Sequence, residues 1–275
     1  MTTALRPLGT GELLDRTFSL YRSHFGLFVG IFALPYMVVL AFQLVGLVFQ
    51  SSSPKLSNIL LSATWSVGAG LLALLVSAVS QAATVVAVSN LHLERPANVT
   101  DSFRAVKGQV LGVLGLSLLV NLAAGCGLVA LIVPGVLLWI MWSLAVPVKV
   151  LEHQGVFDSM SRSMELTKGD WGRIFVIGLL IVALKVGVSS LLQWPILIAA
   201  GFSIRGGVQQ MSVGWQVALL ASAFVATSLV GGLATIAFSV VYYDERVRKE
   251  AFDLQLMMTT LDAPTLPVSP AQAGA

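Results

Sequence analysis

Residues Leu56–Leu93 read LSNILLSATWSVGAGLLALLVSAVSQAATVVAVSNLHL and contain no Asp, Glu, Lys or Arg. A helix needs only about 20 apolar residues to cross a bilayer core about 30 Å thick. Similar uncharged stretches occupy Gly26–Gln50 and Gly108–Val148. The chain of 275 residues is 56% hydrophobic and 11% charged, whereas soluble domains carry roughly 25% charged residues. The sequence therefore predicts a multi-pass membrane protein and excludes a large aqueous domain.

We expect an all-α fold, a polytopic membrane helix bundle with six transmembrane helices. Four of these predicted helices occupy Gly26–Gln50, Ile59–Asn90, Ile174–Phe202 and Trp215–Tyr243. The other two share Gly108–Val148, which is about twice the minimum span. Gly125-Cys126-Gly127 and Pro134-Gly135 mark a hairpin between them. Pro134 suits the first turn of the second helix, where a backbone N–H has no helical partner to lose.

The charged residues are divided unequally between the two sides of this predicted membrane. All 13 acidic residues lie on the side of the termini, and so do all the Lys and Arg residues except Lys55, Lys185 and Arg205. Loops rich in Lys and Arg face the cytoplasm. Both termini are therefore predicted to be cytoplasmic, and an even number of crossings is consistent with their lying on one side.

A short amphipathic segment precedes each predicted hairpin on the cytoplasmic side, before the first, third and fifth helices. The segments contain Leu14, Phe18, Tyr21 and Phe25 at helical spacing, then Asp101-Ser102-Phe103 before Lys107-Gly108, and Asp158-Ser159-Met160 before Lys168-Gly169. We predict three units, each an interfacial helix followed by a membrane hairpin. The alternative is chance similarity, since any loop between spans must be amphipathic.

The chain divides into four predicted regions. Residues 1–25 form a cytoplasmic amphipathic segment and residues 26–243 the transmembrane domain. Residues 244–261 continue the last span as a solvated charged helix, because Asp244 and Arg248, like Arg246 and Glu250, are four residues apart. The Pro- and Ala-rich residues 262–275 are predicted to be a disordered tail.

Lys185 is the ionisable residue deep in a predicted span, and no predicted span contains an Asp or Glu to pair with it. A lysine at the centre of a transmembrane helix costs about 2.5–3.5 kcal/mol on insertion scales. Lys185 is therefore a candidate ligand residue in an internal cavity, with Ser189 on the same helix face and Asn121 or Gln81 from other spans. There it would attract an anionic head group or substrate. The alternative is that it snorkels to an interface, or stays neutral against hydroxyls and carbonyls.

Charged residues on the cytoplasmic side form a second candidate group, either for docking a partner or for salt bridges among the interfacial helices. They are Glu12, Asp15, Arg16, Arg22, Arg162, Glu165, Lys168, Asp244, Arg246 and Arg248. The flanking arginines favour salt-bridge networks. Nucleophile elbows, Walker loops and His-Glu-x-x-His motifs are absent from the sequence. We expect no catalytic, cofactor-binding or metal-binding residues, no cofactor and no nucleic-acid partner.

Four segments together resemble a bacterial membrane-protein family. They are Arg6–Leu8 with Gly11–Phe18, Pro134-Gly135 with Pro147-Val148, Ser161–Gly169, and Tyr242–Glu250. Together they are similar to the membrane domain of some bacterial glycerophosphodiester phosphodiesterases, in its stand-alone form. The resemblance implies that catalysis in the fused enzymes belongs to a separate TIM barrel, which takes roughly 250 residues. The spans leave no room for it here, so we expect no phosphodiesterase activity.

Two functional hypotheses follow. The first is a non-catalytic scaffold of the bacterial cytoplasmic (inner) membrane, which docks a protein on its cytoplasmic face or organises lipid. The alternative is a transporter or lipid-handling protein with a central polar cavity around Lys185. The expected partners are membrane lipids, a cytoplasmic protein and further copies of the chain.

Overall fold

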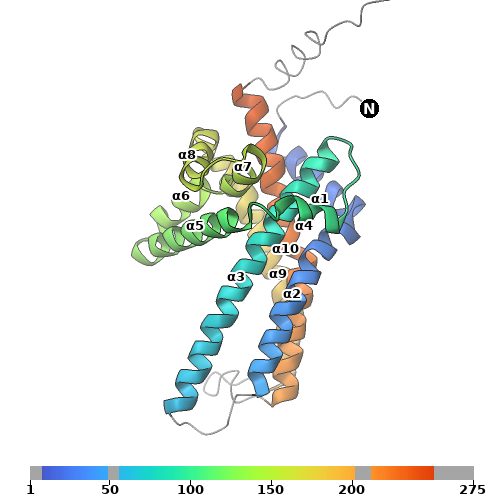
Figure 1. Ribbon diagram of the computed structural model, residues 1–275, viewed down its shortest axis with the longest axis vertical. Coiled ribbons are helices and arrows are strands. Elements are labelled where there is room, and N and C mark those ends of the chain that lie inside the picture. The colour runs from blue at the N-terminus through green and yellow to red at the C-terminus, as the bar shows by residue number, and fades with distance from the viewer. Residues whose placement is uncertain (1–7, 49–55, 202–211, 251–275) are drawn as a thin grey trace, which may run out of the picture.

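The computed structural model describes residues 8–48, 56–201 and 212–250, and every regular element in these ranges is an α-helix (Figure 1). The helices are α1 (Thr10–Ser23), α2 (Phe25–Val48), α3 (Leu56–His92), α4 (Val99–Val106), α5 (Val110–Ala130), α6 (Ile132–Met141), α7 (Ala145–Glu152), α8 (Val156–Thr167), α9 (Trp171–Ala199) and α10 (Val213–Glu250). Lys55, Arg205 and the predicted regions beyond Glu250 lie outside the described residues.

Six segments of these helices are long and apolar enough to cross a membrane: α2, α3, α5, α6 together with α7, α9 and α10. They confirm the predicted all-α polytopic bundle. Their outer faces carry large exposed apolar side chains, such as Leu111 at 85% and Val129 at 90% exposure. Apolar surface of this extent suits contact with lipid.

The three predicted amphipathic helices are also present. α1, α4 and α8 precede α2, α5 and α9, which are the first, third and fifth spans. Each of them has an inward face, with Leu13 and Thr17 buried in α1, Val106 in α4 and Leu166 in α8, whereas Phe18 of the predicted apolar face is exposed. A helix with one polar face and one inward face can lie along the surface of the bundle.

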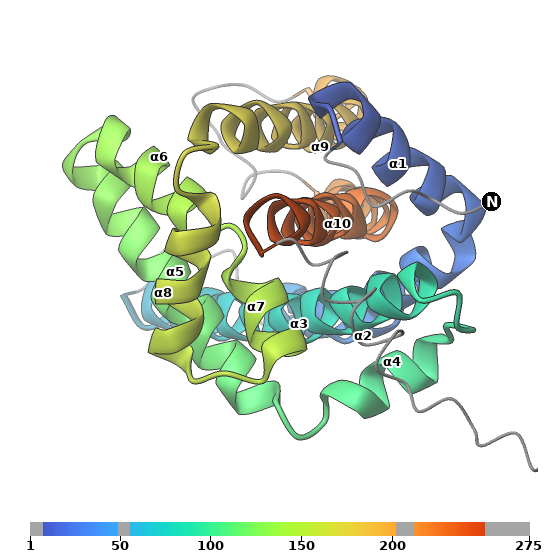
Figure 2. The same ribbon diagram turned by 90° about the horizontal axis from the view of Figure 1, so that it is seen from above.

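α10 is the central helix of the bundle, with α9 on one side and α2 and α3 on the other (Figure 2). It can pack closely against α2 because Gly231 and Gly232 carry no side chain where the ring of Phe32 lies. Ile236, Ala237 and Val241 of α10 are completely buried in the same core. Gly231 and Gly232 thus let α2 lie close to α10.

One end of the bundle gathers α1, α4, α7, α8 and the last turns of α10, and we call it the charged end (Figure 1). α2, α3, α9 and α10 extend from this end along the molecule. The α5–α6 pair instead extends sideways from the bundle close to the charged end in both views (Figures 1 and 2). The space between this pair and the long helices is where the cavity described below lies.

The turn between α5 and α6 differs from the prediction. α5 continues through Gly125-Cys126-Gly127, and the chain reverses at Leu131, which is extended with φ −158° and ψ 136°. Gly127 and Gly135 instead allow the two helices to touch, since a Cβ on Gly127 would lie 2.9 Å from the Gly135 Cα. Pro134 lies in the first turn of α6, as predicted.

We predict that Gly135→Ala destabilises the protein, because its Cβ would lie 2.4 Å from the backbone nitrogen of Leu128. Overpacking of this kind costs about 1–3 kcal/mol. Gly125→Ala is the matched control, since a Cβ there meets nothing within 4 Å. Thermal unfolding of the detergent-purified variants should show a lower midpoint for Gly135→Ala only. Equal midpoints would contradict the close packing of the pair.

Candidate functional site

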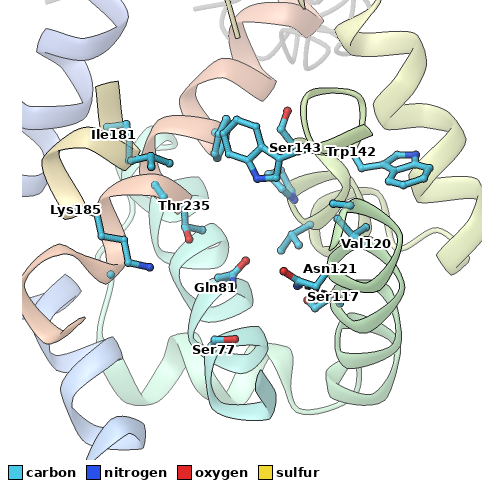
Figure 3. Close-up of a pocket in the computed structure, with 18 of the residues that line it drawn as sticks. Ser77, Gln81, Ser117, Val120, Asn121, Trp142, Ser143, Ile181, Lys185 and Thr235 are labelled. Carbon is cyan, nitrogen blue, oxygen red and sulfur yellow. Dashed lines mark hydrogen bonds between the residues drawn. The ribbon is translucent and has the colours of Figure 1, made fainter. Parts of the chain in front are cut away.

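A cavity of about 340 Å³ lies inside the bundle, between the α5–α6 pair and the long helices (Figure 3). Its walls come from α2, α3, α5, α6, α7, α9 and α10. Its apolar lining includes Phe32, Trp139 and Phe238, whereas Ser77, Gln81 and other polar residues contribute hydroxyl and amide groups. A mixed lining of this kind suits a ligand that has both polar and apolar parts.

Lys185 contributes the charge of this cavity. It is the middle residue of the 29-residue helix α9, so it lies about 21 Å from either end at about 1.5 Å per residue. Its side chain is exposed at the surface of the protein, and Figure 3 shows its amine directed into the cavity. The amine thus lies halfway along a candidate membrane span.

Two pairs of polar residues lie across the cavity from Lys185 (Figure 3). Ser77 and Gln81 lie on α3, and Ser117 and Asn121 lie on α5, each pair four residues apart. This spacing puts both members of a pair on one helix face. The Asn121 side-chain amide donates to the Ser117 backbone carbonyl oxygen at 2.7 Å. The Asn121 side-chain oxygen takes no part in this bond.

Two hydrogen-bond donors in the cavity wall have no partner among the described residues. They are the Ser117 hydroxyl and the indole N–H of Trp142, and both atoms are buried. A buried donor without a partner costs about 1–3 kcal/mol. Because neither atom is accessible from the cavity, these two donors do not by themselves indicate a ligand.

The electrostatic balance of the cavity favours an anion. No Asp or Glu is among the described residues that line it, and Lys185 is the charged one. A charge in a medium of low polarity is expensive unless it is paired. An anionic ligand beside Lys185 would provide that pairing.

The structure thus brings three of the four predicted cavity residues, Lys185, Gln81 and Asn121, to one cavity. Ser189 is not part of it. Ser189 lines a separate groove on α9, which it shares with Lys185. The ligand-binding role of all four residues stays a prediction.

The prediction missed several residues of the cavity wall, among them Ser77, Ser117, Trp139 and Trp142. Ser77 and Ser117 each lie one helical turn before a polar residue that was predicted. Such i, i+4 pairs of polar residues within an apolar span are a signal that the sequence does contain. The tryptophans carry no comparable signal, because tryptophan is ordinarily found where spans meet the membrane interface.

The predicted docking residues take part in a network of ion pairs at the charged end. Arg173 of α9 pairs with Asp244 and, at 3.2 Å, with Glu245 of α10, whose side chains are 2% and 0% exposed. The Leu8 backbone N–H donates to Asp244 at 2.6 Å, and its carbonyl accepts from Arg248 at 2.6 Å. The start of the described chain is therefore tied to the end of α10.

A second part of the network joins α7, α8 and α10. Arg162 of α8 pairs with Glu250 and, at 3.6 Å, with Glu152. Glu152 also accepts a hydrogen bond of 2.8 Å from the Tyr242 hydroxyl. Lys249 donates to carbonyl oxygens at the end of α8, including that of Leu166 at 2.6 Å. A cation at a helix C-terminus is also favoured by the helix dipole.

The two buried carboxylates beyond the apolar part of α10 respond differently to this environment. Burial raises the pKa of Glu245 to about 7, and the nearby Asp170 carboxylate adds to the effect while Arg173 and Lys249 oppose it. Burial also acts to raise the pKa of Asp244, but hydrogen bonds from Leu8, Arg248 and Arg173 outweigh it and hold that pKa below its usual value.

The solvated helix predicted from residue 244 onward is therefore wrong at Asp244 and Glu245, whereas Arg248 and Lys249 are exposed as predicted. The helix does continue to Glu250 with the predicted pairs of Asp244 with Arg248 at 2.8 Å and Arg246 with Glu250 at 3.0 Å. Asp244 and Glu245 are buried because α9 and the Leu8 backbone cover them. Spacing along one helix cannot reveal what packs against it.

The remaining docking candidates are spread around the charged end. Glu12 accepts from the Gly9 N–H at 2.8 Å, and Arg16 contacts the His92 Nδ1 at 3.2 Å. Glu165 pairs with Arg162 at 3.2 Å. Asp15, Arg22 and Lys168 are exposed. Salt bridges are thus present as predicted, and the docking of a partner stays a prediction.

Comparison with models of known protein families, with curated proteins and with solved structures finds no match for this chain. The resemblance to the phosphodiesterase membrane domain stays a prediction.

We predict that Arg173→Gln lowers the free energy of unfolding by up to about 3–5 kcal/mol, because it removes the cation that the buried carboxylates of Asp244 and Glu245 share. Arg104→Gln is the matched control, since the Arg104 side chain is 78% exposed and lies 3.8 Å from Asp101. Exposed pairs contribute about 0–1 kcal/mol. Thermal unfolding in detergent measures both losses. Similar losses in the two variants would contradict a structural role for the network.

We also predict that Glu245 makes the free energy of unfolding depend on pH. Its pKa in the folded protein, about 7, is above its ordinary value of 4.5. The folded state therefore binds the proton more tightly than the unfolded state, and the stability contributed by this group is lost as the pH rises through about 7. Glu245→Gln should remove this loss. Melting curves from weakly acidic to weakly basic pH measure it, and parallel profiles for both proteins would contradict it.

Proposed function

We propose that this multi-pass membrane protein is a lipid-handling protein whose central cavity binds the anionic head group of a membrane amphiphile. The observation that carries the proposal is the exposed amine of Lys185 at the midpoint of α9, in a cavity whose described lining has no carboxylate. A phosphate or carboxylate there would pair with this amine and accept hydrogen bonds from the wall.

The composition of the cavity favours an amphiphile over a small inorganic anion. Phe32, Trp139 and Phe238 line it beside the polar residues. These apolar side chains can contact the hydrocarbon next to a head group, whereas a free phosphate would leave them without a partner. Because Lys185 also lines an open groove on α9, a lipid in the bilayer would have access to it from that side.

We propose further that the charged end faces the cytoplasm, in a bacterial inner membrane. The Lys and Arg residues in the loops of this end support that orientation. The chain would act there without catalysis of its own.

The scaffold hypothesis has less support from the geometry than the lipid-handling hypothesis. It depended on charged residues at the cytoplasmic face, and the strongest of these, such as Arg162 and Arg248, pair with residues of the same chain. Side chains held in this way have little left to offer a partner. Lys185, by contrast, faces open space.

We predict that Lys185→Gln reduces the anionic lipid that co-purifies with the protein by about tenfold, because a hydrogen bond to a charged group contributes about 1.5–3 kcal/mol. Lys185→Arg should retain the lipid. Lys168→Gln is the matched control, since it removes an exposed cation at the charged end. Mass spectrometry of phosphatidylglycerol bound per protein measures the effect. Equal amounts in wild type and Lys185→Gln would refute the proposal.

A further inference from the structure

A groove on the outer face of α9 continues from the cavity at Lys185. It has a volume of about 510 Å³ and is lined by Val182, Lys185, Val186, Ser189, Ser190, Gln193, Trp194 and Leu197. The cavity and the groove share Val182 and Lys185. α9 begins at the charged end with Trp171, so the groove extends from the middle of the helix toward its other end at Ala199.

The cavity meets α9 on the charged-end side of the groove. The α9 residues in its wall are Ile181, Val182 and Lys185, of which Lys185 is the central residue of the helix. The rest of its wall includes Val146 and Pro147 of α7, a helix of the charged end. The two hollows therefore meet at Val182 and Lys185, with the cavity toward the charged end and the groove toward Ala199.

A strip of polar side chains follows this groove. Lys185, Ser189 and Gln193 are four residues apart, so they lie on one face of α9 at intervals of about 6 Å. Ser189 and Gln193 are half-buried within the groove. Polar groups on the outer face of a spanning helix are costly in hydrocarbon, and this strip gains a partner when a head group lies on it.

The occupant that fits this arrangement is an anionic lipid. Lys185 supplies a positive charge at the middle of α9 that complements the anionic head group. Ser189 and Gln193 supply hydrogen bonds further along the helix. Val186, Trp194 and Leu197 form the apolar lining of the groove beside the strip. A head group can therefore follow the strip while its acyl chains stay in the surrounding hydrocarbon.

We propose that the protein moves anionic lipid head groups between the two leaflets, along a path from the cavity past Lys185 to Ser189 and Gln193. This proposal rests on the lipid binding proposed above. Each step exchanges one set of hydrogen bonds to the head group for another, and no covalent bond is made or broken. The path can be followed in both directions, so the protein equilibrates the lipid between the leaflets.

The test uses the full chain in phosphatidylcholine vesicles that contain phosphatidylglycerol with a fluorescent acyl chain. Dithionite destroys the fluorophores of the outer leaflet. With wild-type protein, nearly all fluorescence should be lost, because inner-leaflet lipid reaches the outside. Without protein, the inner-leaflet signal should persist. The same assay with labelled phosphatidylcholine should show slower transfer, since that head group has no net charge.

Variants of α9 test the path itself. Ser189→Leu and Gln193→Leu should slow transfer by about tenfold or more, since a leucine blocks the strip and removes its hydrogen bond. Gly187→Leu is the matched control, because it adds the same side chain on α9 where a Cβ meets nothing within 4 Å. Both groove variants should still co-purify with phosphatidylglycerol, since the cavity is intact.

The outcomes separate the two proposals. Wild-type protein that binds phosphatidylglycerol but does not transfer it would overturn the path and leave the binding site in place. Protein that does not bind the lipid would overturn the proposed function itself. Transfer at wild-type rate in both groove variants would show that α9 is not the route. Cross-linking of Ser189→Cys between two chains, after replacement of Cys126, would identify a second copy as the occupant of the groove and refute the path.

Discussion

The low polarity of a lipid bilayer determines where this chain can place its charges. Every ion pair that the described residues form lies at one end of the bundle, where water is within reach. Along the spans, backbone groups are satisfied within helices, as a hydrocarbon environment requires. Lys185 departs from this arrangement, since it places an ammonium halfway along α9. An exception to so strict a constraint points to function.

The two cations of α9, Arg173 and Lys185, have different surroundings. Arg173, near the start of the helix, pairs with the buried carboxylates of Asp244 and Glu245 and joins α9 to α10. Lys185 lies twelve residues further on, in a cavity whose described lining offers no carboxylate. A buried charge is stabilised by a partner of opposite charge in the same chain. A cation without such a partner can instead gain stability from a ligand.

The position of the α5–α6 pair creates the space for that ligand. Because this pair extends sideways at the charged end (Figures 1 and 2), it covers the long helices over only part of their length. Ser117 and Asn121 of α5 then face Ser77 and Gln81 of α3 across a cavity (Figure 3). The close contact of Gly127 with Gly135 lets α5 and α6 act as one wall.

The sequence alone determined the helical membrane fold, the six candidate spans and the three amphipathic helices, because these features follow from the local pattern of apolar and charged residues. It also singled out Lys185 as a lysine without an acidic partner in its span. Only the tertiary structure decided that Gln81 and Asn121 share its cavity, that Ser189 does not, and that Asp244 is buried. These depend on which helices pack together, and helix packing joins residues far apart in the chain, which no local pattern records.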